Sequence, residues 1–264
     1  SVVFVSLASA CTLLATVSVA IRFVSRLRMS KSWWDDWTIL AALVLAYGYL
    51  LTVVLAVTIG GAGYHIVQYS QDQIERYLQM IMANYALYSA SITLSKLAIL
   101  LFLHCVFGRE RWLMIGTWII GCLVIAYFFL ALGFLIFACN PVRGAWNPWI
   151  QSKCINSKAF WIGMAAFNIV LDLALLVLPQ MTLWKLQLSR QKRLMISMIF
   201  VLGGLVCVAS VVRIWYLSRI DMADLTCKSI SDPPSFTIIE TDLSIICACL
   251  PMFPALFRSD TQSK

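Results

Sequence analysis

Charged side chains inside apolar segments are the residues of this sequence that could do chemistry. Ionised groups are costly inside a bilayer, so they survive there by pairing with one another or by lining an aqueous path or ligand cavity. Three bases and three acids stand within or at the edge of apolar runs: Arg22, Lys96, Asp172, Arg213, Glu240 and Asp242. The three positive and three negative charges can therefore neutralise one another. Each of the six residues is a candidate for a functional role.

The position of each charge along its apolar run predicts its partner. Arg213 stands late in the sixth run, while Glu240 and Asp242 stand early in the seventh, so all three are expected at a similar depth. Consecutive helices are often neighbours, which predicts that Arg213 pairs with Glu240 or Asp242. The two acids are about 200° apart on a helix. Both cannot face one partner, so the second would be left for a ligand or an aqueous cavity.

A second pair is predicted between the third and fifth runs. Asp172 lies near the middle of the fifth run, and Asn168, four residues earlier, shares its helix face. Lys96 has the long side chain needed to reach Asp172. We therefore expect a cavity that opens outward, or a set of ion pairs that only holds the helices together. The candidate residues are Lys96, Asn168, Asp172, Arg213, Glu240 and Asp242.

The elements that position these residues are membrane-spanning helices. Of the 264 residues, 61% are hydrophobic and only 12% are charged, which excludes a soluble enzyme, a disordered chain and a secreted disulfide scaffold. A spanning helix needs about 20 apolar residues, and seven runs reach that length: 2–24, 37–59, 77–107, 113–137, 159–184, 194–217 and 236–257. The runs are continuous rather than alternating, which favours helices over a β-barrel. We predict an all-α, seven-transmembrane-helix bundle, with residues 1–264 as one domain in a lipid bilayer.

The basic residues predict the orientation of this bundle. The first, third and fifth loops and the tail hold eleven Lys and Arg residues, against six in the other loops. Basic loops stay in the cytoplasm, so the N-terminus is expected outside and the C-terminus in the cytoplasm. The net charge of +8 is then a topology signal rather than a sign of nucleic-acid binding. Arg190, Lys192 and Arg193 are candidate contacts for a cytoplasmic partner, or part of that topology signal.

Three cysteines fall on the side expected to be oxidising: Cys139, Cys154 and Cys227. We favour a Cys139–Cys154 disulfide, with Cys227 bonded to either one, or three free thiols, as alternatives. The other six cysteines lie in apolar runs, where a free thiol behaves as a small buried hydrophobe. We find no metal-ligand spacing, no nucleophile–base pair and no phosphate-binding loop, and we therefore expect no metal site, no cofactor and no enzyme.

The order of several short motifs resembles one known family. They include Trp34-Asp35-Asp36-Trp37, Gly61-Ala62-Gly63-Tyr64-His65, Cys139-Asn140-Pro141, Leu178-Pro179 and Leu250-Pro251. The ordered set resembles the fungal rhodopsin-like domain family, which includes satratoxin-cluster membrane proteins and seven-helix receptors implicated in surface sensing. This resemblance implies a plasma-membrane receptor for a small-molecule or surface ligand, with a cytoplasmic G protein as a candidate partner.

Two departures from other seven-helix proteins narrow this expectation. The run 236–257 has no lysine, so it lacks the Schiff-base residue through which opsins hold retinal. The third run ends Phe107-Gly108-Arg109-Glu110-Arg111 rather than in the Asp-Arg-Tyr of animal receptors, so G-protein coupling follows only from topology and family. The alternative function is a transporter, or an accessory membrane protein of a secondary-metabolite pathway, in which Lys96, Asp172 and Arg213 would line a proton or anion path.

Overall fold

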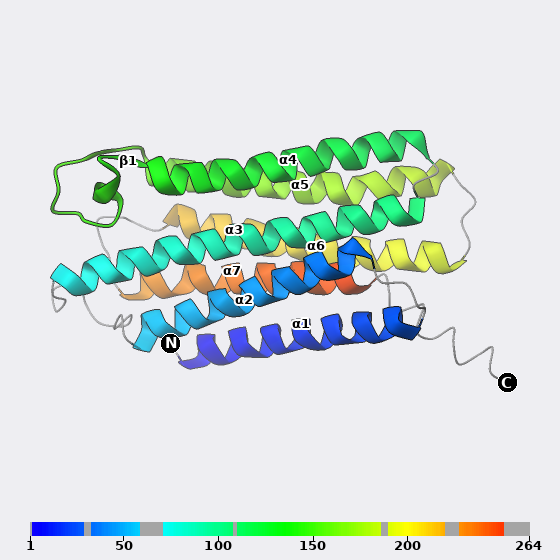
Figure 1. The fold of residues 1–264 in the computed structure, drawn as a ribbon, viewed down its shortest axis with the longest axis horizontal. Helices are drawn as coiled ribbons and strands as arrows, with labels where there is room; N and C mark the ends of the chain where they lie inside the picture. Colours follow the sequence, from blue (N-terminus) through cyan, green and yellow to red (C-terminus); the bar gives the residue numbers. More distant parts are fainter. Residues whose placement is uncertain are drawn as a thin grey trace.

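Seven α-helices lie side by side along the long axis of the molecule (Figure 1). The computed structural model describes residues 2–28, 33–58, 71–107, 110–185, 190–219 and 227–250. Within these ranges the helices are α1 (Val2–Arg28), α2 (Trp34–Thr58), α3 (Gln71–Phe107), α4 (Arg111–Phe137), α5 (Ser157–Lys185), α6 (Arg190–Arg219) and α7 (Cys227–Cys249). The predicted all-α helical bundle is confirmed.

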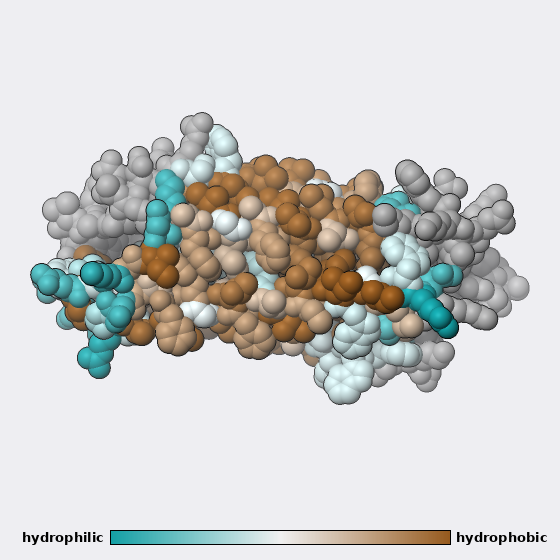
Figure 2. Space-filling view, turned by 90° about the horizontal axis from the view of Figure 1, so that it is seen from above, coloured by the Kyte–Doolittle hydropathy of each residue, from teal (hydrophilic) through white to brown (hydrophobic). Residues whose placement is uncertain are grey.

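The outer surface of the bundle is built for lipid. Large apolar side chains such as Leu14, Trp118, Phe129 and Val201 are more than half exposed on it, and Figure 2 shows a broad apolar band with hydrophilic residues toward the two ends. Among the described residues, six helices are long and apolar enough to span a membrane. The chain is therefore a multi-pass membrane protein.

The helices extend beyond the apolar runs that predicted them. α1 begins at Val2 as predicted, and α2 to α6 begin two to six residues before the predicted starts. The first, fifth and sixth helices end later than predicted, and the second ends one residue early, at Thr58. Hydropathy marks only the part in contact with lipid, whereas backbone hydrogen bonds continue into polar flanks. The largest difference is in α7, predicted over 236–257, which begins at Cys227 because its first turns are polar. The predicted end at 251–257 lies outside the described residues.

The seven helices form a closed arrangement with α3 in the interior. α3 packs against α2, α4 and α7, while α1 contacts both α2 and α7 and so closes the bundle; α5 lies between α4 and α6. Ser91, Ile92, Ser95 and Leu103 of α3 are fully buried. At 37 residues, α3 is about 55 Å long, longer than the roughly 30 Å hydrocarbon core. It is therefore tilted in the bilayer or extends beyond the hydrocarbon core.

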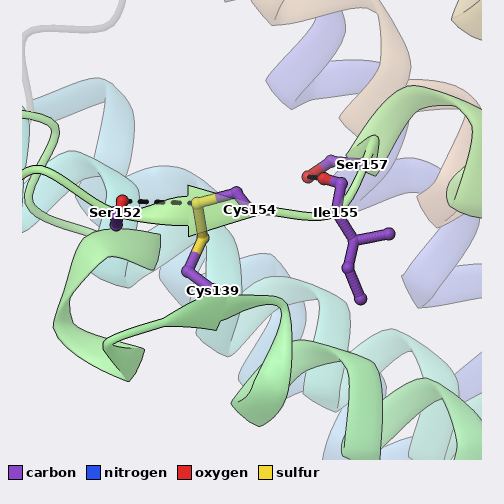
Figure 3. Close-up of a disulfide and its surroundings, with 5 residues drawn as sticks. All are labelled: Cys139, Ser152, Cys154, Ile155 and Ser157. Carbon is purple, nitrogen blue, oxygen red and sulfur yellow. Dashed lines mark hydrogen bonds between the residues drawn. A yellow bond between two sulfur atoms is a disulfide. The ribbon is translucent and has the colours of Figure 1, made fainter.

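A small disulfide-bonded hairpin marks one end of the bundle. β1 (Cys139–Asn140) pairs antiparallel with β2 (Lys153–Cys154), with Cys139 opposite Cys154, and a short 3-10 helix, η2 (Val142–Ala145), lies between them. Cys139 and Cys154 form a disulfide (Figure 3). The favoured pairing is thus confirmed, and the side chain of Cys227 lies outside the described residues. We call this end of the bundle the disulfide end.

The remaining described cysteines in apolar runs form no disulfide, but they are not all buried. Cys247 and Cys249 are buried, Cys11 and Cys207 are half-buried, and Cys105 and Cys122 are exposed on the helix surface. The expectation of buried thiols is therefore wrong for the last two, because a helix in lipid presents apolar residues outward as well as inward.

The disulfide gives a direct test of the hairpin. Alkylation of the purified, non-reduced protein is expected to leave Cys139 and Cys154 unlabelled, and reduction should add two labels, both within residues 139–154, by peptide mass. Since the bridge spans 15 residues, its loss in Cys139→Ser should destabilise the closed hairpin by about 3 kcal/mol. Labelling of both thiols without reduction would contradict the structure.

Candidate functional site

The predicted pair between α3 and α5 lies in the interior of the bundle. Lys96 Nζ is 3.0 Å from Asp172 Oδ1. The same ammonium donates hydrogen bonds to Asn168 Oδ1 at 2.7 Å and to the Asn168 carbonyl at 3.1 Å. All three side chains are buried. The Lys96–Asp172 prediction is confirmed, and Asn168 completes the shell of oxygens around the lysine.

The second pair joins α6 to α7. Arg213 Nε lies 3.1 Å from Glu240 Oε2, which also accepts a hydrogen bond from the Tyr88 hydroxyl at 3.1 Å. Glu240 Oε1 accepts from Ser210 Oγ at 2.5 Å and from Asn168 Nδ2 at 2.8 Å. Glu240 is completely buried. Several donors from different helices thus hold a carboxylate that has no access to water.

Asn168 joins the two pairs into one network. Its amide oxygen accepts from Lys96, and its amide nitrogen donates to Glu240. We call Lys96, Asn168, Asp172, Arg213 and Glu240 the charge network. Its two cations and two anions balance, which is the condition under which ionised groups can be kept out of water. Because its members come from α3, α5, α6 and α7, moving any of these helices relative to the others must disturb an ion pair.

Asp242 lies apart from the charge network. Its Oδ2 accepts a hydrogen bond from Thr12 Oγ1 of α1 at 2.9 Å, while Oδ1 has no hydrogen-bond partner among the described residues. The expected divergence of Glu240 and Asp242 is therefore confirmed, with Glu240 facing Arg213. A role in ligand binding for any of the six candidate residues stays a prediction.

A second group of ion pairs, which the sequence did not reveal, lies near the end of the bundle away from the disulfide. Arg22 of α1 contacts Asp35 and Asp36 of α2 at 2.5 and 2.8 Å. Arg26 contacts the same two acids at 2.7 and 3.4 Å. Arg22 Nη1 also donates to the Ala248 carbonyl of α7 at 2.5 Å. We call Arg22, Arg26, Asp35 and Asp36 the α1–α2 ion cluster.

This cluster corrects the expected partner of Arg22. Arg22 does not neutralise an acid of the third to seventh helices, because the first turn of α2 brings two aspartates to it across a short connection. The signal was present in the sequence: two basic residues four apart at the end of one apolar run, and Asp35-Asp36 at the start of the next. Both acids border an apolar run instead of interrupting it, so hydropathy alone does not mark them as buried.

Two small cavities flank the charge network. The first, of about 30 Å³, is lined by Arg213, Tyr85, Tyr88, Tyr127 and Trp161, among others, and we call it the aromatic cavity. The second, of about 20 Å³, is lined by Lys96, Asp172, Gly203, Ser244 and Cys247, among others, and we call it the lysine cavity. Each has room for one or two water molecules.

The aromatic cavity lies in the half of the bundle toward the disulfide end. Trp161 is in the second turn of α5, which begins at that end, and Leu217, which also lines the cavity, is in the last turn of α6. The ring of Trp161 stacks on that of Tyr85 with 4.2 Å between centroids. The carbon of the Arg213 guanidinium lies 4.9 Å from the centre of the Tyr88 ring. Arg213 is thus the charged residue in the lining of this cavity, and Ser89 and Thr237 add hydroxyl groups beside the aromatic rings.

The predicted cytoplasmic contacts Arg190, Lys192 and Arg193 fall in the first turn of α6. Their side chains lie outside the described part of the chain. In the ranges that the structure describes, no three His, Cys, Asp or Glu side chains are grouped so as to bind a metal ion.

Seven helices, an apolar belt and a buried, balanced charge network define an integral membrane protein of the helical-bundle class. The chain belongs to the fungal rhodopsin domain family, whose model matches residues 21–259. The resemblance found in the sequence motifs is thereby confirmed.

Three relatives illustrate the range of this family. The chain is 33% identical over 202 residues to a SAT4 family membrane protein of Emericella nidulans, which covers 75% of this chain and 50% of the relative. It is 27% identical over 251 residues to Receptor GIN3 of Arthrobotrys oligospora, covering 93% and 60%. It is 24% identical over 171 residues to Satratoxin biosynthesis SC1 cluster protein 4 of Stachybotrys chartarum, covering 64% and 62%. The chain thus spans only half to about three fifths of the length of these relatives, and no solved structure matches it.

Proposed function

We propose that this protein is a seven-helix receptor of the fungal plasma membrane that senses a small-molecule or surface cue and catalyses no reaction. The observation that carries the proposal is the charge network, which ties α3, α5, α6 and α7 together beside the aromatic cavity. The similarity to a relative named as a receptor supports it.

In such a receptor, the ion pairs of the charge network can be intact in one conformation and broken in another. A ligand can shift a conformational equilibrium only through contacts that differ between two states. Arg213 lines the aromatic cavity and also pairs with Glu240, so a contact made there changes the balance between α6 and α7. α6 is one helix from Arg190 to Arg219. Movement near Arg213 therefore carries to its far end, where Arg190, Lys192 and Arg193 would meet a cytoplasmic partner such as a G protein.

Two independent features support an orientation with the N-terminus outside. The Cys139–Cys154 disulfide is stable in an oxidising compartment, and the more basic loops fall at the opposite end of the bundle. The aromatic cavity, which lies toward the disulfide end, would then face the exterior.

The second candidate function is transport, or an accessory role in a secondary-metabolite pathway. It is favoured by the lysine cavity on the other side of the charge network and by relatives named as biosynthesis cluster proteins of polyenoic acids and satratoxin. A path through the bundle would have to pass Lys96, Asp172 and Arg213 and break their ion pairs in turn.

Cells that display the full chain at the surface can separate the two functions. Epitope tags at the two ends report orientation: the N-terminal tag should bind antibody on intact cells, the C-terminal tag only after permeabilisation. Culture extracts of the source fungus are then applied while cytosolic calcium and cAMP are recorded. A receptor should give a signal that is reduced at least tenfold in Asp172→Asn and Arg213→Lys at equal surface expression.

Uptake is measured in parallel with proteoliposomes that hold the purified protein and the same extracts. Signalling without accumulation supports the receptor. Accumulation inside the vesicles that Asp172→Asn abolishes supports the transporter. Unaltered signalling in both variants would refute a role for the charge network.

A further inference from the structure

Arg213 has hydrogen-bonding capacity that the described residues leave unused. Its Nη2 is buried without a hydrogen-bond partner, and its Nε, although 3.1 Å from Glu240 Oε2, is not aligned to donate. The whole residue is only 8% exposed. Buried donors are nearly always satisfied, and leaving one unsatisfied costs free energy. Because Arg213 lines a cavity, its Nη2 can donate a hydrogen bond to an acceptor atom of a bound molecule.

The charge balance around Arg213 decides which acceptor fits. Lys96 and Arg213 already match Asp172 and Glu240 one for one. Glu240 is further held by hydrogen bonds from Tyr88, Asn168 and Ser210. A carboxylate entering the aromatic cavity would add an uncompensated negative charge close to that buried carboxylate. A neutral oxygen acceptor satisfies the free guanidinium nitrogen and leaves the balance unchanged.

The size and lining of the cavity restrict the ligand further. About 30 Å³ holds a group of one or two heavy atoms, not a ring, since a cavity that binds benzene is about 150 Å³. The lining around Arg213 is aromatic, with the stacked Tyr85 and Trp161 on one side. The part of a ligand that follows the acceptor would meet these apolar ring faces.

We propose that the aromatic cavity binds the carbonyl oxygen of an uncharged, largely apolar molecule, such as a ketone, ester or lactone, through the free nitrogen of Arg213. This inference rests on the proposed receptor function and names the chemical class of its ligand. Bound this way, the ligand shares the guanidinium with Glu240, which links occupancy of the cavity to the pairing of α6 with α7.

Three probes of nearly the same shape test the proposal with the purified full chain in lipid nanodiscs. Acetone offers a neutral carbonyl, acetate a carboxylate, and 2-methylpropene no oxygen, and none of the three carries a ring. Binding is measured by ligand-observed NMR, with empty nanodiscs subtracted for lipid partitioning. We expect acetone to bind at least tenfold more tightly than either of the other two, which is the effect of one hydrogen bond from a charged donor.

Two variants assign the binding to the cavity. Arg213→Lys keeps a cation for Glu240 but has no second nitrogen, so acetone affinity should fall at least tenfold. The matched control is Arg22→Lys, the same change in the α1–α2 ion cluster, which should leave affinity unchanged. If Arg213→Lys fails to fold, Ala131→Val adds two methyl groups to the cavity lining without touching an ion pair, and it should also abolish binding.

Tighter binding of acetate, equal binding of 2-methylpropene, or wild-type affinity in both Arg213→Lys and Ala131→Val would overturn the proposal. The assay requires no signalling. Carbonyl-selective binding by a protein that gives no cellular response would support the binding site and refute the receptor function. A cellular response without carbonyl selectivity would support the receptor function and refute the binding site.

Discussion

Replacing Glu240 by leucine is expected to destabilise the folded bundle by about 3–5 kcal/mol, the usual cost of removing one partner from a buried ion pair. The substitution leaves Arg213 without its counterion and withdraws the acceptor from Tyr88, Asn168 and Ser210. Unfolding free energies can be measured by titrating mixed detergent micelles with dodecyl sulfate and following tryptophan fluorescence.

Asp242 provides the control from the same helix, only two residues away. Its contact with described residues is a hydrogen bond from Thr12, which an amide oxygen can also accept. Asp242→Asn should therefore change stability by about 1 kcal/mol or less. The double variant Glu240→Leu/Arg213→Leu should lose less than the sum of the two single variants, because no buried charge of that pair remains. Equal losses in Glu240→Leu and Asp242→Asn would contradict the assigned ion pair.

Replacing Arg22 by leucine is the second change expected to have a large effect. It leaves the buried acids Asp35 and Asp36 with Arg26 as their remaining cation in the cluster, and removes the bond from Arg22 to the Ala248 carbonyl. We expect a loss of about 3–5 kcal/mol in the same assay. Arg26→Leu should cost less, because its Nε lacks a hydrogen-bond partner and Arg22 still contacts both acids.

Charge balance predicts a rescue for this cluster. Adding Asp35→Asn to Arg22→Leu removes one of the two competing carboxylates, so part of the lost stability should return. Adding Asp242→Asn to Arg22→Leu changes an acid outside the cluster and should restore nothing. If both additions behave alike, the α1–α2 ion cluster is not what stabilises this end of the bundle.

The in-membrane ion pairs could be predicted because charges in apolar runs are few and depth restricts their partners. Depth along the apolar runs predicted the Lys96–Asp172 ion pair and left Glu240 and Asp242 as the two candidate partners of Arg213. Choosing Glu240 over Asp242 required knowing that α1 packs against α7 and takes the other face. Helical periodicity shows that two residues lie on different faces of a helix, but it does not show which neighbouring helix each face contacts.

The polar residues that complete the charge network were harder to foresee. Tyr88 and Ser210 are ordinary in a membrane helix, and only the packing shows that both donate to Glu240. The α1–α2 ion cluster was missed for a different reason. Asp35 is only 2% exposed although it stands just before the start of an apolar run, where hydropathy alone predicts contact with water.

The two acids of α7, Glu240 and Asp242, have a consequence for how the protein is made. An aspartate near the centre of a helix costs about 2.5–3.5 kcal/mol at insertion by the translocon. The two acids contact Thr12 on α1 and Arg213 on α6, both of which leave the ribosome before α7. Membrane entry of α7 therefore depends on helices already synthesised, and the last step of biogenesis is also the step that completes the charge network.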